Sequence, residues 1–188
     1  EVLLRGPIVM RGYWQNDAAN AEVFDADRWF KTGDLGKLDD DGYLFIVGRK
    51  KELIVTAGGK NVAPAQLEDP LRANPLISQA VVIGDAKPFV SALVSIDEEM
   101  LPLWLENNGI KEPMSLDKAR ENPLVLAEIS KAIESVNKDF SSAESIRKFA
   151  VLPEDLTEKS GHLTPSLKIK RSVVTGGTPG LSARSPAT

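Results

Sequence analysis

The segment from Gly48 to Pro64, GRKKELIVTAGGKNVAP, divides the chain into two parts. A basic cluster comes first, followed by a short apolar run, a Gly-Gly pair and a second short run that ends at a proline. The run from Leu53 to Val55 favours a strand, and a pair of glycines can supply the positive φ angles that a tight hairpin turn needs. We therefore expect a hinge that leads into a β-hairpin, with the end of one domain before it and a second domain after it.

The sequences on either side of this segment predict different architectures. Residues 1–48 are expected to be the β-rich end of the first domain, in which the run DDDG at residues 39–42 predicts the turn of a hairpin. Residues 49–51 are the expected hinge, and residues 52–171 the expected second domain. Residues 172–188 are rich in Ser, Thr, Gly, Pro and Ala and have almost no apolar periodicity, so we expect a disordered tail there.

Helix and strand signals alternate through the second domain. Pro64 suits the first position of a helix that ends near Arg72, and Asn122-Pro123 opens a longer amphipathic helix. Strands are expected at three apolar runs, residues 79–83, 89–96 and 146–152. This order predicts an α+β fold, in which a small domain combines a β-hairpin, a three-stranded sheet and flanking helices.

The composition excludes several kinds of site. The chain has 188 residues, a formal net charge of −4 and no cysteine. The negative charge argues against a general nucleic-acid binder, and the lack of cysteine excludes disulfides, thiolate metal ligands and a cysteine nucleophile. The lack of cysteine also fits a cytoplasmic location. No apolar run approaches the roughly 18 residues of a membrane-spanning helix, and the start at Glu1, without a signal peptide, suggests a fragment of a longer protein.

Three local patterns suggest other sites but do not fit them. Gly59-Lys60 is similar to the end of a phosphate-binding loop, but that motif requires glycine where this chain has Ile54 and Ser or Thr where it has Asn61. His162 is the only histidine and has no second histidine or cysteine nearby in the sequence, so no metal site is expected there.

The third pattern is the run of aspartates at residues 39–41, which is similar to part of a calcium-binding loop. In that frame Lys37 takes the first ligand position and Gly48 the twelfth, where glutamate is needed. A hairpin turn explains the aspartates better.

Four motifs, taken together and in order, carry a family resemblance. They are WFKTGDL at residues 29–35, GR at 48–49 followed by GGKNVAPAQLE at 58–68, QAVVIGD at 79–85, and LTPSLKIKR at 163–171. In this order they resemble the C-terminal part of the acyl-adenylate-forming, AMP-binding enzymes, a family of acyl-CoA synthetases, peptide-synthetase adenylation domains and beetle luciferases. Ser166-Leu167 stands where the commonest family form has Ser-Gly. Together with GGKNVAPA, it is most similar to the long-chain fatty acyl-CoA synthetase branch.

The resemblance implies a nucleotide site and a hinge in the first part of the chain. Asp34 would accept hydrogen bonds from the ribose hydroxyls of ATP, a task suited to a carboxylate. Arg49 would help to hold the same nucleotide. Lys51 matches the hinge position about which the small domain rotates.

The resemblance also implies that the second domain serves two half-reactions. Lys168 would be the catalytic residue, because a mobile ammonium can stabilise the negative charge that develops on the α-phosphate when a carboxylate attacks ATP. Gly58 and Gly59 would line the channel of the CoA arm, where missing side chains let the backbone approach the thiol arm. Rotation at the hinge would then exchange Lys168 for the glycine hairpin.

The enzyme implied by the resemblance is an AMP-forming acid–thiol ligase. Its substrates and cofactors would be a long-chain fatty acid, ATP, Mg2+ and CoA, and its partner the chain's own N-terminal domain, with peripheral membrane association of the full enzyme as an option. Since the phosphate loop, adenine pocket and acyl tunnel of the family lie in that domain, we expect the isolated chain to be inactive. Two alternatives stay open: a carrier-protein phosphopantetheine as acceptor, and a non-catalytic α+β interaction module.

Overall fold

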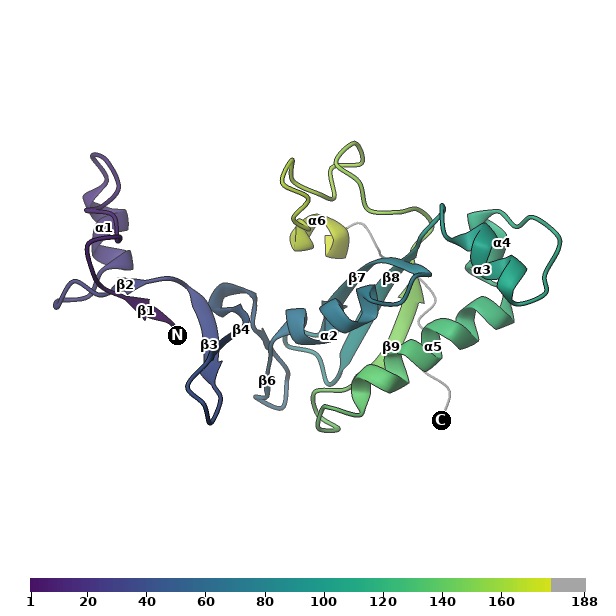
Figure 1. Cartoon of the computed structure of the whole chain (residues 1–188), viewed down its shortest axis with the longest axis horizontal. Coiled ribbons are helices and arrows are strands. Elements are labelled where there is room, and N and C mark those ends of the chain that lie inside the picture. The colour runs from purple at the N-terminus through teal and green to yellow at the C-terminus, as the bar shows by residue number, and fades with distance from the viewer. Residues whose placement is uncertain (177–188) are drawn as a thin grey trace. The chain divides into compact units, whose positions relative to one another are not determined.

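The computed structural model describes residues 1–176 and divides the chain into two units, Glu1–Leu53 and a second that begins at Ile54 (Figure 1). The predicted hinge, residues 49–51, lies at the end of the first unit, where strand β4 is followed by the 3-10 helix η1, Lys50–Glu52.

The first unit consists of two small antiparallel pairs and a short helix. Strand β1 (Leu3–Leu4) pairs with β2 (Phe30–Lys31), and β3 (Asp34–Leu38) pairs with β4 (Leu44–Arg49). The predicted turn at residues 39–42 is confirmed, and Asp39 Oδ1 accepts hydrogen bonds from two backbone N–H groups within it. Helix α1 (Asp17–Val23) begins after Asn16, whose side chain accepts from Ala19 N.

The first unit, all of which is described, contains very little hydrophobic core. Phe24 is its one buried hydrophobic side chain. Large apolar side chains lie on its surface instead, and they include Ile8, Trp14, Leu38, Tyr43, Leu44, Phe45 and Ile46. An exposed apolar surface of this kind is typical of a segment that is covered by a partner.

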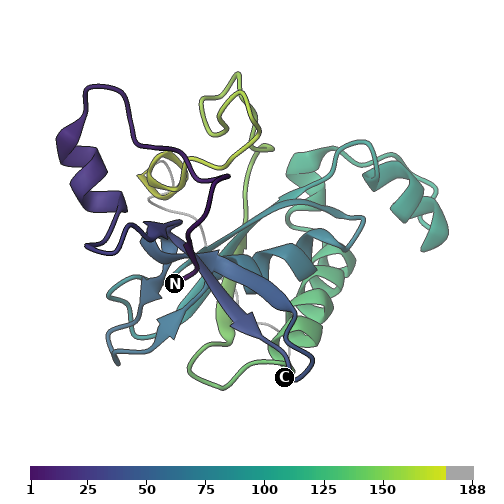
Figure 2. The same cartoon turned by 60° about the vertical axis from the view of Figure 1, so that its left-hand side comes forward.

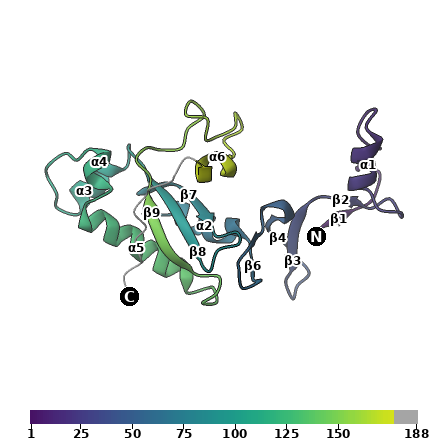
Figure 3. The same cartoon turned by 180° about the vertical axis from the view of Figure 1, so that it is seen from behind.

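The second unit is built on a three-stranded sheet with the order β7-β8-β9. Strand β7 (Ile77–Ile83) runs antiparallel to β8 (Val90–Ile96), and β8 runs parallel to β9 (Ile146–Val151); Figure 3 shows β8 and β9 side by side from behind. The prediction of an α+β fold with a three-stranded sheet is confirmed.

Both faces of this sheet are buried, and the side chains alternate between them as a pleated strand requires. One face packs against helices α2 (Pro64–Arg72) and α5 (Pro123–Asn137) through Ala80, Val82, Ala92, Val94, Phe149 and Val151. The other face packs against the segment after β9 through Val81, Leu93, Ala150 and Leu152. Figure 2 shows α5 on one side of the sheet and α6 on the other.

Local signals in the sequence explain where the helices begin. Helix α2 begins at Pro64 and ends at Arg72, as predicted, two residues after Pro70. Helix α5 begins after Asn122, whose side chain accepts hydrogen bonds from Leu124 N and Val125 N. Two shorter helices, α3 (Leu101–Asn107) and α4 (Leu116–Ala119), lie between β8 and α5, and α4 was not predicted.

The predicted disorder from residue 172 onward is wrong for residues 172–176. Helix α6 covers Arg171–Gly176, and Val174 is buried against the sheet with Leu156 and Leu163. One apolar side chain on a short helix is enough when an existing core receives it. The rest of the predicted tail, residues 177–188, lies outside the described residues.

We predict that Glu144→Gln changes how stability depends on pH. The hydrogen bond from Ser141 Oγ, helped by Lys60 and opposed by burial, holds the pKa of the Glu144 carboxyl below its usual value of 4.5. The carboxylate therefore stabilises the fold fully above pH 4.5, and this contribution is lost as the pH falls through the lower, folded-state pKa. The measurement is denaturant unfolding from pH 7 to pH 3.

Wild type should exceed the Glu144→Gln variant in free energy of unfolding near neutral pH, and the difference should shrink below pH 4.5. A difference that grows on acidification would contradict the assignment, because it would require a raised rather than a lowered pKa.

Candidate functional site

The β3–β4 pair brings two of the predicted nucleotide-binding residues together. Asp34 and Arg49 are register partners, and Arg49 Nη1 donates to Asp34 Oδ1 at 2.5 Å. Within residues 1–176 this bond involves only Oδ1 of the carboxylate. Since an ionised carboxylate can accept several hydrogen bonds, Oδ2 remains able to accept one from a ligand hydroxyl.

The turn before Asp34 fixes the position of this carboxylate. Gly33 has a φ angle of 75°, a conformation that glycine adopts without a steric penalty. Thr32 Oγ1 accepts from Asp34 N at 3.0 Å and donates to Val2 O at 2.9 Å. Lys50 N donates to Gly33 O at 2.8 Å, which joins the turn to the start of the hinge. The Thr-Gly-Asp motif is therefore held by bonds on both sides.

A pocket of about 630 Å³ lies next to this turn within the first unit. The residues of the Thr-Gly-Asp turn and of the hinge meet in its wall, which includes Thr32, Gly33, Arg49, Lys50 and Lys51. Unpaired cations in such a wall would attract an anionic ligand. Here the three cations are paired with acids: Arg49 with Asp34, Lys50 with Glu1 and Lys51 with Glu22. The hydrogen bond from Lys50 lowers the pKa of the Glu1 carboxyl.

The predicted glycine hairpin lies in the second unit. Strand β5 (Ile54–Val55) pairs with β6 (Asn61–Val62), and Gly59 N donates to Thr56 O to close the turn. Only Gly59 has a positive φ, of 77°, so the expectation that both glycines supply positive φ angles is wrong for Gly58.

No atom of residues 1–176 would clash with a Cβ at position 58. An added Cβ there would meet only Thr56 Oγ1, at 3.9 Å. The fold thus needs glycine at position 59 but not at position 58.

The hairpin is tied to the turn between β7 and β8. Val55 N donates to Asp85 Oδ1 at 3.1 Å, Ala86 N donates to Val55 O, and Ala57 N donates to Lys87 O. Ile54 and Val62 are buried in the same core as α2 and α5. The exposed tip of the hairpin therefore projects from a well-anchored base.

Lys168 lies at the exposed end of the loop that follows β9. Thr164 N donates to Lys168 O at 2.8 Å, and Lys168 N donates to Thr164 Oγ1 at 3.0 Å. An isolated bridge between Leu163 and Ile169 closes the base of this turn. Among residues 1–176 the Lys168 ammonium has no hydrogen-bond or ion-pair partner, so the amine is available to a ligand.

Leu167 adopts a conformation that suits glycine. Its φ angle is 59°, and its side chain is 71% exposed. For a residue other than glycine or asparagine this conformation costs roughly 1–2 kcal/mol. The structure thus explains why glycine is the fitting residue before the lysine, and shows that Leu167 takes up this conformation in its place.

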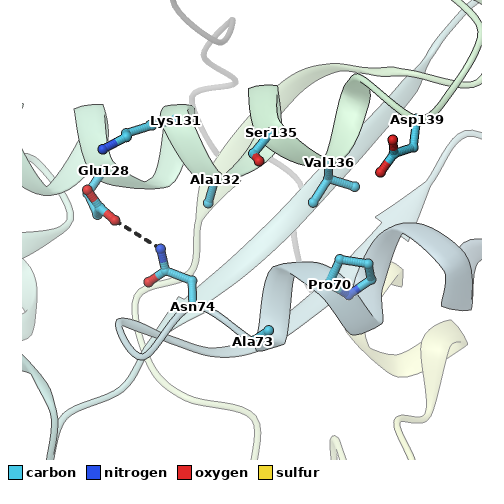
Figure 4. A pocket seen from close by; sticks show the side chains of 9 residues that line it. All are labelled: Pro70, Ala73, Asn74, Glu128, Lys131, Ala132, Ser135, Val136 and Asp139. Atoms are coloured by element: carbon cyan, nitrogen blue, oxygen red, sulfur yellow. Dashed lines mark hydrogen bonds between the residues drawn. The ribbon is translucent and has the colours of Figure 1, made fainter.

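A second hollow, of about 370 Å³, lies between α2 and α5 (Figure 4). Asn74 and Glu128 face each other across it, and Asn74 Nδ2 donates to Glu128 Oε1 at 3.0 Å. None of the predicted site residues lines this hollow. Its wall is mixed polar and apolar and includes Pro70, Ala73, Lys131, Ala132, Ser135, Val136 and Asp139.

Residues 1–176 contain no cluster of three or more His, Cys, Asp or Glu side chains able to hold a metal ion. No helix in this range is both long enough and apolar enough to span a membrane.

Comparisons with known proteins place this arrangement in a family. The model of the family described as "AMP-binding enzyme C-terminal domain" matches residues 51–176. The fold resembles the A domain of carboxylic acid reductase from Segniliparus rugosus with a TM-score of 0.71 and 22% identity, covering 93% of this chain and 26% of that one. The chain therefore belongs to the AMP-binding enzyme C-terminal domain family.

Within that family, the chain is similar to relatives that are named as fatty-acid–CoA ligases. The chain is 57% identical over 174 residues to long-chain-fatty-acid–CoA ligase FadD15 of Mycobacterium tuberculosis, covering 93% of the chain and 29% of the relative. It is 35% identical over 191 residues to long-chain-fatty-acid–CoA ligase ACSBG2 of Xenopus laevis, covering 93% of the chain and 26% of the relative. The chain thus spans less than a third of the length of these relatives.

We predict that alanine substitutions separate the two hairpin glycines. Gly59→Ala should destabilise the second unit by about 1–2 kcal/mol, because alanine must adopt a left-handed conformation. Gly58→Ala should leave stability unchanged, since its Cβ meets only ordinary contact distances. Denaturant unfolding of the two variants beside wild type is the measurement. Equal destabilisation by both substitutions would contradict the assigned turn geometry.

Proposed function

We propose that this chain is the C-terminal part of an ATP-dependent long-chain fatty acid–CoA ligase. The observation that carries the proposal is the 57% identity, across 93% of the chain, to a relative named as such a ligase. The site geometry supports it, because Asp34 and Arg49 lie together beside the hinge and Lys168 is unpaired among the described residues. The fatty acid, ATP and CoA are the proposed substrates, and the large N-terminal domain is the proposed partner.

In the proposed first half-reaction, an oxygen of the fatty acid carboxylate attacks the α-phosphorus of ATP. The bond to the bridging oxygen breaks, pyrophosphate leaves and acyl-AMP forms. Asp34 would accept hydrogen bonds from the ribose hydroxyls once these displace Arg49 or use Oδ2. Lys168 would stabilise the charge that develops on the phosphoryl oxygens, where a preorganised cation is most effective.

In the proposed second half-reaction, the thiolate of CoA, its proton already lost to solvent, attacks the acyl carbonyl carbon. The bond from that carbon to the phosphate oxygen breaks, and AMP leaves. The tip of the β5–β6 hairpin would line the path of the thiol arm. Gly58 is suited to this because it is exposed. The fold itself does not require glycine at this position, so the absence of a side chain there is free to serve the ligand. Rotation about Lys51, which is exposed in η1, would exchange Lys168 for this hairpin.

Magnesium would neutralise charge on the phosphates when ATP binds. The described residues contain no cluster of acids able to hold it, so we assign it no ligand in this chain and no step that depends on one.

We predict that Lys168→Ala in the full-length protein slows adenylation and leaves thioester formation intact. Loss of the ammonium should reduce fatty-acid-dependent ATP–pyrophosphate exchange by about 100-fold or more, the scale of losing one charge-stabilising donor. Thioester formation from synthetic acyl-adenylate should continue, with CoA compared against a carrier-protein phosphopantetheine as acceptor.

The matched control for this variant is Lys170→Ala. Lys170 is an exposed lysine on the same loop, and it is anchored through its backbone N–H to His162 O. The control should catalyse ATP–pyrophosphate exchange at the wild-type rate. Unchanged adenylation in Lys168→Ala would refute the role of Lys168.

We also predict that the 188-residue chain alone catalyses no fatty-acid-dependent ATP–pyrophosphate exchange. The described residues offer the proposed ribose-binding carboxylate and the lysine, while the acyl tunnel and phosphate loop are proposed to lie in the N-terminal domain. The full-length protein at equal concentration is the positive control. Robust exchange by the chain alone would refute this division of the site.

A further inference from the structure

A buried ion pair connects helix α2 to the end of the loop that carries Lys168. Arg171 Nη1 lies 2.6 Å from Glu68 Oε1, and Arg171 Nη2 lies 2.6 Å from Glu68 Oε2. The Glu68 side chain is only 4% exposed and the Arg171 side chain 27%. This two-bond arrangement fixes the relative orientation of the guanidinium and the carboxylate, which a single contact would not do.

The same pair also binds the backbone of the sheet. Val82 N donates to Glu68 Oε1 at 2.6 Å, and Arg171 Nη1 donates to Val82 O at 3.3 Å. Strand β7 is an edge strand, so the N–H and C=O groups on its outer side have no neighbouring strand to pair with. The ion pair satisfies both groups of Val82 and thereby joins α2, β7 and the start of α6.

The loop that bears Lys168 is attached at its other end by a second carboxylate. Ser78 Oγ donates to Asp155 Oδ2 at 2.7 Å, and Ser95 Oγ donates to Asp155 Oδ1 at 2.5 Å. Lys168 is much closer along the chain to Arg171 than to Asp155. Beyond the local bonds between Lys168 and Thr164, Arg171 is therefore the nearer of the two attachments along the chain.

We propose that the Glu68–Arg171 pair is a positioning device for Lys168 in the adenylation half-reaction. This inference rests on the function proposed above and extends it to two residues that contact no substrate. A bidentate pair that is bonded to the sheet backbone holds the loop in one place, so that the ammonium meets the developing charge. A displacement of about 1 Å in such a group can cost about 100-fold in rate.

The two sides of the pair differ in what else holds them. Helix α2 is also fixed by Leu67 and Leu71, which are fully buried in the main core. The Lys168 loop is held by the pair, by Asp155 and by the apolar side chains that flank it, which are Leu156, Leu163, Ile169 and Val174. Loss of the pair therefore loosens the part of the loop next to Lys168 and leaves α2 in place, together with the hairpin that precedes it.

The test uses Glu68→Gln combined with Arg171→Met in the full-length protein. The glutamine side chain keeps an acceptor for Val82 N, and removal of both charges avoids the large cost of one unpaired buried charge. Fatty-acid-dependent ATP–pyrophosphate exchange should fall by about 100-fold, with the loss in kcat, because the loop no longer holds the lysine in place. Thioester formation from synthetic acyl-adenylate should stay at the wild-type rate.

The matched control is Glu128→Ala, which removes the hydrogen bond from Asn74, in the turn after α2, to α5 without touching the Lys168 loop (Figure 4). It should leave both half-reactions unchanged. Hydrogen exchange should be faster across residues 156–170 in the double variant, and unchanged in α5. If the double variant does not fold, Arg171→Lys tests the same idea, because lysine keeps the positive charge but cannot make the two parallel hydrogen bonds of a guanidinium. A smaller loss of ATP–pyrophosphate exchange is then expected, again without loss of thioester formation.

Equal loss of both half-reactions, or no loss in either, would overturn the positioning role. Absence of fatty-acid-dependent ATP–pyrophosphate exchange in the wild-type full-length protein would overturn the proposed function itself and the inference with it. The wild-type measurement therefore separates the two failures.

Discussion

The three-stranded sheet of the second unit is buried on both faces, and the functional segments of that unit are attached to one face or the other. The glycine hairpin shares its core with α2 and α5 through Ile54 and Val62. The Lys168 loop packs on the opposite face through Leu163 and Ile169. Because packed interiors transmit displacement with little deformation, the sheet is a rigid spacer between the two segments. In the proposed function, a single rotation of the unit would withdraw one segment as it presents the other.

The two arginine–carboxylate pairs, Asp34–Arg49 and Glu68–Arg171, differ in burial, which suits the different roles proposed for them. Asp34 and Arg49 lie near the surface, with side chains 30% and 58% exposed, where an ion pair contributes little net free energy and opens readily. Glu68 is almost fully buried, so loss of its partner alone would leave a costly unpaired charge. An exposed pair suits residues that must accept a ligand, whereas a buried pair suits residues that must hold a loop.

Signals that act within a few residues were predictable from the sequence. Pro64 and Asn122 define helix starts through their own backbone and side-chain chemistry, and the Asp39 turn does the same for a hairpin. Features that depend on distant contacts were not. Helix α6 exists because Val174 meets a core, and Glu68 and Arg171 are 103 residues apart. For the site, sequence motifs predicted Asp34, Arg49 and Lys168, and these roles stay predictions, but motif spacing carried no sign of what holds the lysine.

The parallel pairing of β8 with β9 has a consequence for how the chain folds. These two strands are separated in sequence by α3, α4 and α5, so the sheet is not complete until the chain has returned across this intervening segment. Pairing between distant segments is slow because the loop entropy is lost before the contacts form. During that interval the apolar run of β8 has an unpaired edge, a feature that favours misassembly with other chains. Early docking of α5 against α2 would shorten this interval.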